Sequence, residues 1–340
     1  MKKYLIPARI ADNRDTPNFE HILTDNTHNL SDADIVSLAY FFKTNKLFTE
    51  TPIYPKYKSN LMRNLYIIGE LKKIYELCSK RNIEPPILLK GCAYIFKLYE
   101  DDCGYRFLSD IDIYEQDSIR HGKIIEILYH AGYVKGSQYI ETFEKNNIKI
   151  DIHSDLLNSN RVRWRKKFFN TENLEIDTYE KDGFKVLNNN IDFIYCLLHS
   201  AVHHGFTGFK WLLDAHLFLS QKLVSAESIL KKSILLSVAE PIRFCLTFYN
   251  QFFSLSDEWI KTFQLPYKLK AVHKIINAEN RENLQYYINF IFSKNSDKPG
   301  LLFNLFFPER KALQIRYNKN SSMASLYFEH YKKIMRSVLP

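Results

Sequence analysis

Two stretches of the sequence, residues 88–112 and 150–153, limit most strongly what this chain can fold into. Their pattern predicts a strand, a tight turn at Gly91, a helix, and then two further strands that carry carboxylates. Side chains alternate between the faces of a strand, so Asp110 and Asp112 are expected to point the same way. The fold must therefore accommodate two neighbouring negative charges on one face.

Such a pair of carboxylates is unfavourable unless a positive group lies between them. A hard divalent cation is the usual partner, because Mg²⁺ prefers carboxylate oxygens and substrate phosphates. Asp151, expected on a neighbouring strand, would complete a cup of three carboxylates with Asp110 and Asp112. An Asp-Ile-Asp triplet alone is commonly just a solvated surface, but Lys90-Gly91 upstream and Asp151 downstream favour an active site.

Lys90 and Gly91 are expected at the turn where a strand meets a helix. Free N–H groups at a helix N-terminus favour anions, so this pair is a candidate phosphate-binding element. The alternative is a turn that needs glycine for steric reasons alone. Arg106 precedes the carboxylate strand and either contacts phosphate or pairs with Asp101 or Asp102.

Several histidines are candidates for the same site. His153 follows Asp151 by two residues and shares its face, where it orients a carboxylate, touches the substrate or has a structural role. His199, His203 and His204 form a cluster that is either a metal site or part of the interface between helices and sheet. No Glu follows His199 in the HExxH arrangement, which disfavours zinc.

The composition favours a mostly helical chain with a small sheet. Of 340 residues, 25 are Phe and 22 are Tyr, but only 10 are Gly, which argues against a β-sandwich or a glycine-rich dinucleotide-binding fold. The predicted helices cover about residues 32–43, 61–80, 91–99, 118–131, 191–204, 208–219, 226–236, 241–252 and 284–292. The predicted strands cover about residues 87–89, 110–114, 138–143, 148–153, 174–179 and 184–187, with hairpin turns at Asn146-Asn147 and Asp182-Gly183.

These elements predict an α+β protein of three parts. An N-terminal helical region covers residues 1–86, a catalytic domain with a small mixed sheet covers 87–189, and a C-terminal helical domain covers 190–340. The polar run at residues 188–190 marks the expected boundary between the last two parts.

The formal charge of +9 suits a polyanionic partner such as a nucleotide or RNA, although a lysine-rich solvated surface is the simpler explanation. One basic segment is the candidate for gripping RNA, or is an exposed flank. Its cations are Arg161, Arg163, Arg165, Lys166 and Lys167. The five cysteines lack CxxC spacing and are expected to be reduced thiols. No apolar run approaches the roughly 18 residues of a membrane span, so we expect a cytoplasmic protein without a membrane partner.

The order Leu-Lys-Gly, helix, Arg-x-x-Ser-Asp-Ile-Asp, then Ile-Asp-Ile-His resembles the uncharacterised bacterial nucleotidyltransferases of the polymerase-β-like superfamily. Residues 192–204 with 210–214, and the segments 307–310 and 316–317, also resemble that family. More distantly, the chain is similar to abortive-infection and toxin nucleotidyltransferases. It departs from the superfamily pattern at Cys92, where Ser or Gly is usual, and so lacks a hydroxyl that helps to hold the triphosphate.

The resemblance implies a nucleotidyltransferase that moves an NMP group from an NTP, with ATP the first candidate, to an acceptor hydroxyl. Asp110, Asp112 and Asp151 would hold two Mg²⁺ ions, or Mn²⁺, about 3.5–4 Å apart. Asp151 would also help to deprotonate the acceptor, which attacks the α-phosphate as pyrophosphate leaves. The expected nucleotide contacts are Lys90, Gly91, Arg106, His153, His199 and Lys210, while Trp211 either stacks on a base or is a buried core residue.

The expected acceptor is a small molecule or a peptide of a biosynthetic pathway. One alternative is a toxin-like enzyme that modifies tRNA or protein. Another is a catalytically silent module that binds a nucleotide or a partner, an alternative favoured by Cys92.

Overall fold

The structure is a computed structural model. It describes residues 31–42, 48–50, 53–99, 102–136, 141–157, 177–206, 208–266, 284–293, 298–308, 310–317 and 321–338. Within these ranges helices precede and follow a mixed sheet, which confirms the predicted α+β class.

The N-terminal part of the described chain is helical. It consists of α3 (Asp32–Phe42), the short 3-10 helix η2 (Phe48–Glu50) and the long helix α4 (Ile53–Lys80). The sequence predicted that α4 begins near Leu61, but it begins eight residues earlier. Pro55 lies in its first turn, where a missing N–H breaks no helical hydrogen bond, so proline does not oppose this start.

The sheet has seven strands in the order β3-β4-β5-β2-β1-β7-β6. Their bounds are β1 (Ile87–Leu89), β2 (Ile111–Tyr114), β3 (Val134–Lys135), β4 (Thr142–Lys145), β5 (Ile148–His153), β6 (Thr178–Lys181) and β7 (Phe184–Leu187). Helix α5 (Lys90–Lys97) and the 3-10 turn η3 (Cys103–Tyr105) connect β1 to β2, and α6 (Ser118–His130) follows β2. In the centre of the sheet, β2 runs antiparallel to β1 and parallel to β5.

Both predicted hairpins are present. Asn146 and Asn147 have positive φ angles of 48° and 62°, and Asp182 and Gly183 have 52° and 80°. Positive φ at both central residues is the signature of a type I′ turn, which matches the right-handed twist of the flanking strands. These turns fix the β4–β5 and β6–β7 registers, and β5 carries the third predicted carboxylate into the centre of the sheet.

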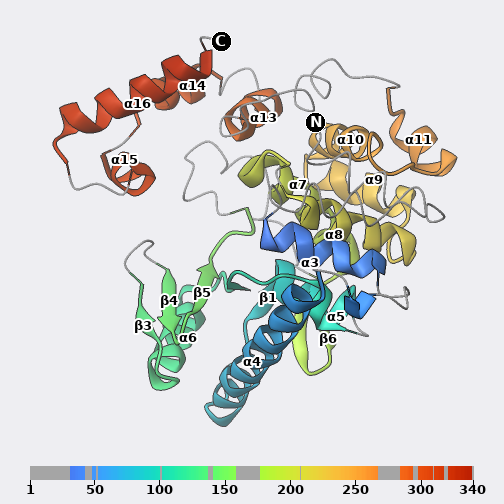
Figure 1. Cartoon of the computed structure of the whole chain (residues 1–340), viewed down its shortest axis with the longest axis vertical. Helices are drawn as coiled ribbons and strands as arrows, with labels where there is room; N and C mark the ends of the chain where they lie inside the picture. The colour runs from blue at the N-terminus through green and yellow to red at the C-terminus, as the bar shows by residue number, and fades with distance from the viewer. Residues whose placement is uncertain are drawn as a thin grey trace.

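The C-terminal part is helical, as predicted. Its helices are α7 (Asn189–His204), α8 (Phe209–Ser220), α9 (Ala226–Leu235), α10 (Ala239–Tyr249), α11 (Asp257–Phe263), α13 (Leu284–Phe292), α14 (Lys298–Phe306), α15 (Arg310–Tyr317) and α16 (Met323–Val338). Helices α7–α11 gather beside the sheet, whereas α14–α16 lie apart from it (Figure 1). None of the helices in the described part of the chain is long and apolar enough to cross a membrane.

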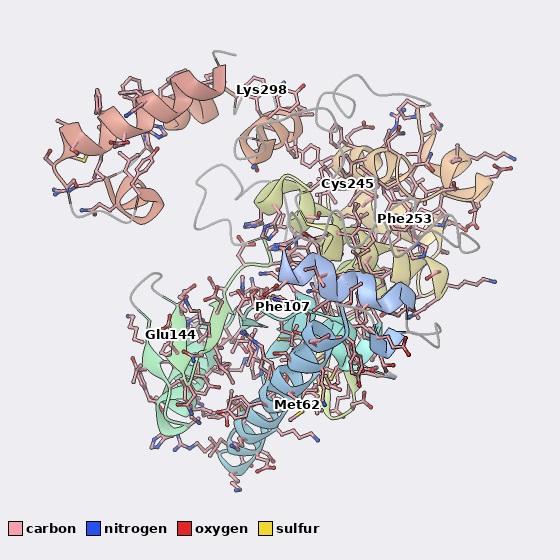
Figure 2. The ribbon with its side chains drawn as sticks, viewed as in Figure 1. Met62, Phe107, Glu144, Cys245, Phe253 and Lys298 are labelled. Atoms are coloured by element: carbon pink, nitrogen blue, oxygen red, sulfur yellow. The ribbon has the colours of Figure 1, made fainter. Side chains whose placement is uncertain are left out.

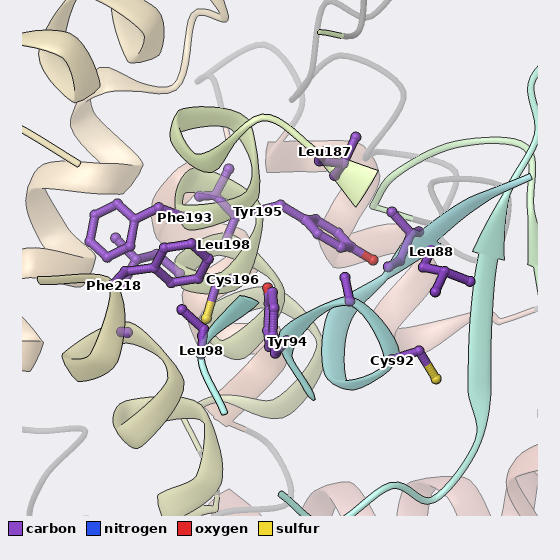
Figure 3. Packing of buried hydrophobic residues seen from close by; sticks show 14 of the residues in the cluster. Leu88, Cys92, Tyr94, Leu98, Leu187, Phe193, Tyr195, Cys196, Leu198 and Phe218 are labelled. Carbon is purple, nitrogen blue, oxygen red and sulfur yellow. The ribbon is translucent and has the colours of Figure 1, made fainter. Parts of the chain in front are cut away.

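One hydrophobic core joins the sheet to the helices that follow it. Figure 3 shows where β1 and α5 meet α7 and α8: Tyr94 of α5 lies beside Cys196 of α7, and Phe193 lies beside Phe218 of α8. The Tyr94 and Phe218 rings meet edge to face with centroids 5.6 Å apart. This packing holds α7 against the half of the sheet that carries the predicted carboxylates.

Candidate active site

Two of the predicted carboxylates face each other across neighbouring strands. The parallel pairing of β2 with β5 places Asp112 directly opposite Asp151. His153, two residues further along β5, brings its Nε2 to 2.7 Å from Oδ1 of Asp112. One potential ligand atom from each of Asp112, Asp151 and His153 lies within 4.8 Å of the others, and these three residues are the candidate metal group of the described part of the chain.

Asp110 approaches this group from outside the strand. The sequence predicted that it lies on the strand with Asp112, but β2 begins at Ile111 and Asp110 lies in the bend before it. The hydroxyl of Ser109 donates to its carboxylate at 2.6 Å, which helps to hold the bend. Burial and the negative charge of Asp112 raise the pKa of Asp110. Because its carboxylate interacts electrostatically with those of Asp112 and Asp151, Asp110 remains a predicted metal ligand.

Neighbouring groups hold Asp112 in its charged form. Burial alone would raise its pKa, but Lys90 and His153 outweigh burial and hold the pKa well below its usual range. The Lys90 ammonium lies 2.5 Å from Oδ1, the same oxygen that accepts the hydrogen bond from His153. Asp112 is therefore a carboxylate at neutral pH.

Lys90 reaches Asp112 from an unusual backbone conformation. Its φ is +52°, in the left-handed region that side chains other than glycine avoid at a cost of about 1–3 kcal/mol. It is the first residue of α5, whose N-terminus is not capped by a side chain. The uncapped N–H groups and the ammonium together make this turn electropositive, as a phosphate site requires.

The two residues that follow Lys90, Gly91 and Cys92, are closely packed. A Cβ atom on Gly91 would lie 2.6 Å from Cδ2 of the buried Leu108, so glycine is needed for steric reasons. The thiol of Cys92 lies 3.5 Å from the carbonyl oxygen of Asp110, and burial raises its pKa so that it stays a thiol. Phosphate contact at Gly91 remains a prediction beside its steric role.

Arg106 forms an internal ion pair. Its Nε lies 2.9 Å from Oδ1 of Asp214, and its Nη2 lies 2.8 Å from Oδ2. Its side chain is only 2% exposed. Of the partners predicted for it, Asp102 instead accepts a hydrogen bond from Tyr57, and Asp101 lies outside the described residues.

Helix α7 contributes the histidine cluster. His203 donates through Nε2 to the carbonyl of Leu157 at 2.6 Å, and Nε2 of His199 lies 3.1 Å from Nε2 of His204. Burial and the charge of Lys90 lower the pKa of His199 well below its usual value, so this imidazole is neutral. The contact with Leu157, just beyond β5, supports the predicted interface between helices and sheet.

Helix α8 supplies Lys210 and Trp211. Trp211 is buried, and its ring stacks on His204 with centroids 4.8 Å apart. The Lys210 ammonium lies 4.7 Å from the centre of the Trp211 ring. Burial and nearby Arg106 lower the pKa of Lys210 to about 8, while Asp110, among other carboxylates, favours its charged form. Lys210 is therefore a second cation on the Asp110 side of the site.

Two contacts near the carboxylates were not predicted individually. Thr142 donates its hydroxyl to Asp151 across the β4–β5 hairpin. A hairpin turn centred on Asn146-Asn147 pairs residue 142 with residue 151, so the predicted turn implies that these two residues face each other. Arg63 of α4 donates to the carbonyl of Ser109 at 3.0 Å and lies over the ring of Phe107, near where α3 and α4 meet (Figure 2). The spacing of apolar residues along α4 did not indicate these contacts of Arg63.

The basic segment at residues 161–167 lies outside the described residues. Its predicted contact with RNA therefore remains a prediction from sequence.

A carboxylate pair on adjacent central strands, beside a lysine at an uncapped helix N-terminus, is an arrangement typical of enzymes that act on nucleotide phosphates, and with His153 it forms a group that could hold a metal ion. A family described as uncharacterised nucleotidyltransferase matches residues 52–254, more than half of the chain. The chain belongs to this family, as the resemblance of its motifs predicted. No curated protein and no solved structure matches the chain.

Proposed function

We propose that the protein is a divalent-metal-dependent nucleotidyltransferase that moves an NMP group from an NTP to an acceptor hydroxyl. The observation that carries the proposal is the opposition of Asp112 and Asp151 across β2 and β5, with a ligand atom of His153 within 4.8 Å. Family membership supports the reaction class. The carboxylates support the use of a metal, because their charge exceeds what Lys90 alone neutralises.

The donor set suits a hard divalent ion. Carboxylate oxygens such as those of Asp110, Asp112 and Asp151 are the ligands that Mg²⁺ and Mn²⁺ prefer. The Nδ1 atom of His153 is buried and has no hydrogen-bond partner among the described residues, so this nitrogen is available to a further partner while Nε2 contacts Asp112. When bound, the metal would neutralise charge on the triphosphate and on the departing pyrophosphate.

The residues of the chain would bind and orient the phosphates. Lys90 and the uncapped N–H groups of α5 face one side of the carboxylates, and Lys210 lies on the side of Asp110. A triphosphate would compete with Asp112 for the ammonium of Lys90, which now lies 2.5 Å from that carboxylate. Asp151 would accept the proton of the acceptor hydroxyl, because it is less buried than Asp112 and can meet a second substrate.

The acceptor that we propose first is a small molecule or a peptide of a biosynthetic pathway; tRNA or protein is the alternative. RNA would bind through the cations of residues 161–167. Binding that weakens steeply with salt and is lost on charge reversal at Arg163 and Arg165 would support RNA. Affinity that is flat across salt would exclude it.

The test is pyrophosphate release from each of the four NTPs with Mg²⁺, with cell extract as the source of acceptor. We expect release that requires extract and disappears in Asp110→Ala/Asp112→Ala. The matched control is Asp182→Asn, because Asp182 is exposed on the β6–β7 turn and asparagine adopts its φ of +52° readily. Release that persists in the double variant would exclude the proposed site.

One observation favours a second candidate function, a nucleotide-binding module without turnover. The Lys90 ammonium already neutralises Asp112 without a metal. Such a module would bind nucleotide equally well with and without Mg²⁺ and would release no pyrophosphate.

A further inference from the structure

One face of α7 is held at both ends against the catalytic part of the chain. Asp192, Tyr195, His199 and His203 follow one another at spacings of three, four and four residues and so share a helix face. They cover most of the length of α7, which spans Asn189–His204.

The two ends of this face have fixed partners. Asp192 accepts from the ammonium of Lys97, the last residue of α5, at 2.6 Å. At the other end, His203 donates to the carbonyl of Leu157, four residues after β5. The middle of the face must therefore lie over the region between α5 and the end of β5. That region contains Lys90, at the start of α5, and His153, at the end of β5.

The middle of the face is polar and unsatisfied. The hydroxyl of Tyr195 and the Nδ1 atom of His199 are buried and lack a hydrogen-bond partner among the described residues. The two rings lie side by side, with centroids 5.6 Å apart. Figure 3 shows the Tyr195 hydroxyl directed from α7 towards Leu88 of β1, two residues before Lys90. Buried polar groups in native proteins nearly always have a partner, so two adjacent exceptions beside the carboxylate site are candidates for contact with a bound molecule.

The chemistry of these two groups restricts that ligand. Burial and the charge of Asp112 raise the pKa of Tyr195, so it stays a neutral phenol, and His199 is a neutral imidazole. Neutral donors and acceptors suit hydroxyl groups, whereas phosphates are met by the cations Lys90 and Lys210. In a nucleotide, the group joined directly to the phosphates is the sugar.

We propose that Tyr195 and His199 bind the sugar hydroxyls of the nucleotide whose phosphates face Lys90. This inference rests on the proposed function, because it takes the Lys90 turn as the phosphate site. It assigns to α7 the discrimination between ribonucleotides and deoxynucleotides. It also adds Tyr195, which the sequence did not single out, to the substrate-binding residues.

The test compares the affinity of each of the four NTPs with that of its 2′-deoxy and 3′-deoxy analogues, with Mg²⁺ and without acceptor. For the tightest-binding NTP we expect at least one analogue to bind about tenfold more weakly, because a site built to bond a hydroxyl rejects ligands that lack it. Tyr195→Phe should weaken binding of the ribonucleotide but leave that analogue unchanged, so that the discrimination disappears. His199→Gln should reduce the discrimination in the same way.

The matched control is Tyr94→Phe. It removes another buried tyrosine hydroxyl, which lies on α5 beside the carboxylate of Asp192. This variant should keep the discrimination. Equal affinity of wild type for ribo- and deoxynucleotides, or an equal loss on both in Tyr195→Phe, would overturn the sugar site and leave the proposed function standing. Failure of wild type to bind any NTP would overturn both.

Discussion

Two buried clusters of opposite charges lie close together in this fold, and they are organised differently. In the structural cluster, each cation meets one carboxylate: Lys97 pairs with Asp192, and Arg106 pairs with Asp214. In the site cluster, Lys90 meets Asp112 while two further carboxylates, Asp110 and Asp151, lie nearby.

The difference separates charges that hold the fold from charges that we propose bind a ligand. The structural pairs join α5 and the chain before β2 to α7 and α8, and every one of their side chains is at most 2% exposed. The site cluster keeps an excess of negative charge, which raises the pKa of Asp110 once burial is added. Such an excess is tolerated in a fold when a cation from outside completes it. The predictions below test this distinction in order of decreasing effect.

The largest effect is expected from Asp112→Asn. Losing a charged group that faces the reacting phosphates should reduce NTP-dependent pyrophosphate release by at least about 10³-fold. Folding should change less than when a structural pair is broken, because Asp110 still interacts with the ammonium of Lys90 and asparagine can still accept the hydrogen bond from His153. Melting temperature and pyrophosphate release should therefore respond independently; a variant that unfolds with the loss of activity would place Asp112 among the structural charges.

Asp214→Asn should show the reverse pattern. It leaves the buried guanidinium of Arg106 without its counter-charge, which typically costs about 3–5 kcal/mol in the free energy of unfolding. Urea denaturation measures this loss. Breaking the exposed Lys56–Asp32 pair with Lys56→Met is the control and should cost less than about 1 kcal/mol. A loss below 1 kcal/mol in Asp214→Asn would remove the distinction between the two clusters.

Metal binding should stabilise the protein through the site cluster and not through the structural pairs. Mg²⁺ or Mn²⁺ at one hundred times its dissociation constant should add about 2.7 kcal/mol to the free energy of unfolding. Asp151→Asn should abolish most of this gain, whereas Asp182→Asn should retain it. Equal metal stabilisation of both variants, followed by thermal melting, would contradict a site at Asp151.

Lys210→Met tests the second cation. Because its pKa is lowered to about 8, below the value near 10.5 of an unfolded lysine, the unfolded chain binds more protons between these pH values. Wild-type stability should therefore gain from this group as pH rises from about 8 to 10.5, and the gain should be absent in Lys210→Met. Nucleotide affinity at pH 7 should fall about tenfold. An unchanged affinity would remove Lys210 from the phosphate site.

The smallest effect is expected from Cys92→Ser. The thiol is buried and faces the carbonyl of Asp110, so a serine hydroxyl can donate to the same oxygen. Stability should change by no more than about 1.5 kcal/mol, and pyrophosphate release by a few-fold. A large gain in activity would show that Cys92 impairs phosphate binding and would favour the silent module.

Local patterns predicted the parts of the fold that local forces determine. Two-residue turns with positive φ set both hairpins, and the Asn146-Asn147 turn therefore carried the register that brings Thr142 to Asp151. The alternation of apolar residues located β5 and, to within one residue, β2, and it placed Asp112 and Asp151 on neighbouring strands, but it wrongly put Asp110 on the strand with Asp112. Family resemblance, confirmed over residues 52–254, gave the reaction class.

Contacts between segments that are far apart in the chain could not be predicted from the sequence. The pairing of Arg106 with Asp214 joins residues 108 positions apart, and no local spacing indicates it. The left-handed backbone of Lys90 occurs beside the close packing of Gly91 on Leu108 and the contact with Asp112, and neither contact is indicated by the local sequence of the turn. The contacts that anchor the two ends of α7, at Lys97 and Leu157, also join residues far apart in the chain.

The anchoring of α7 has a consequence for how the chain can be divided. The sheet ends at Leu187, and the polar residues that follow look like a natural place to cut. A fragment that stops at residue 189 would nevertheless lack Asp192 and Asp214, the counter-charges of Lys97 and Arg106. It would leave Lys97 and Arg106 without the carboxylates that neutralise them and would expose the apolar surface of α5 that α7 and α8 cover (Figure 3). The helices after the sheet are thus part of the unit that folds around the carboxylates, and a minimal active fragment must extend through α8.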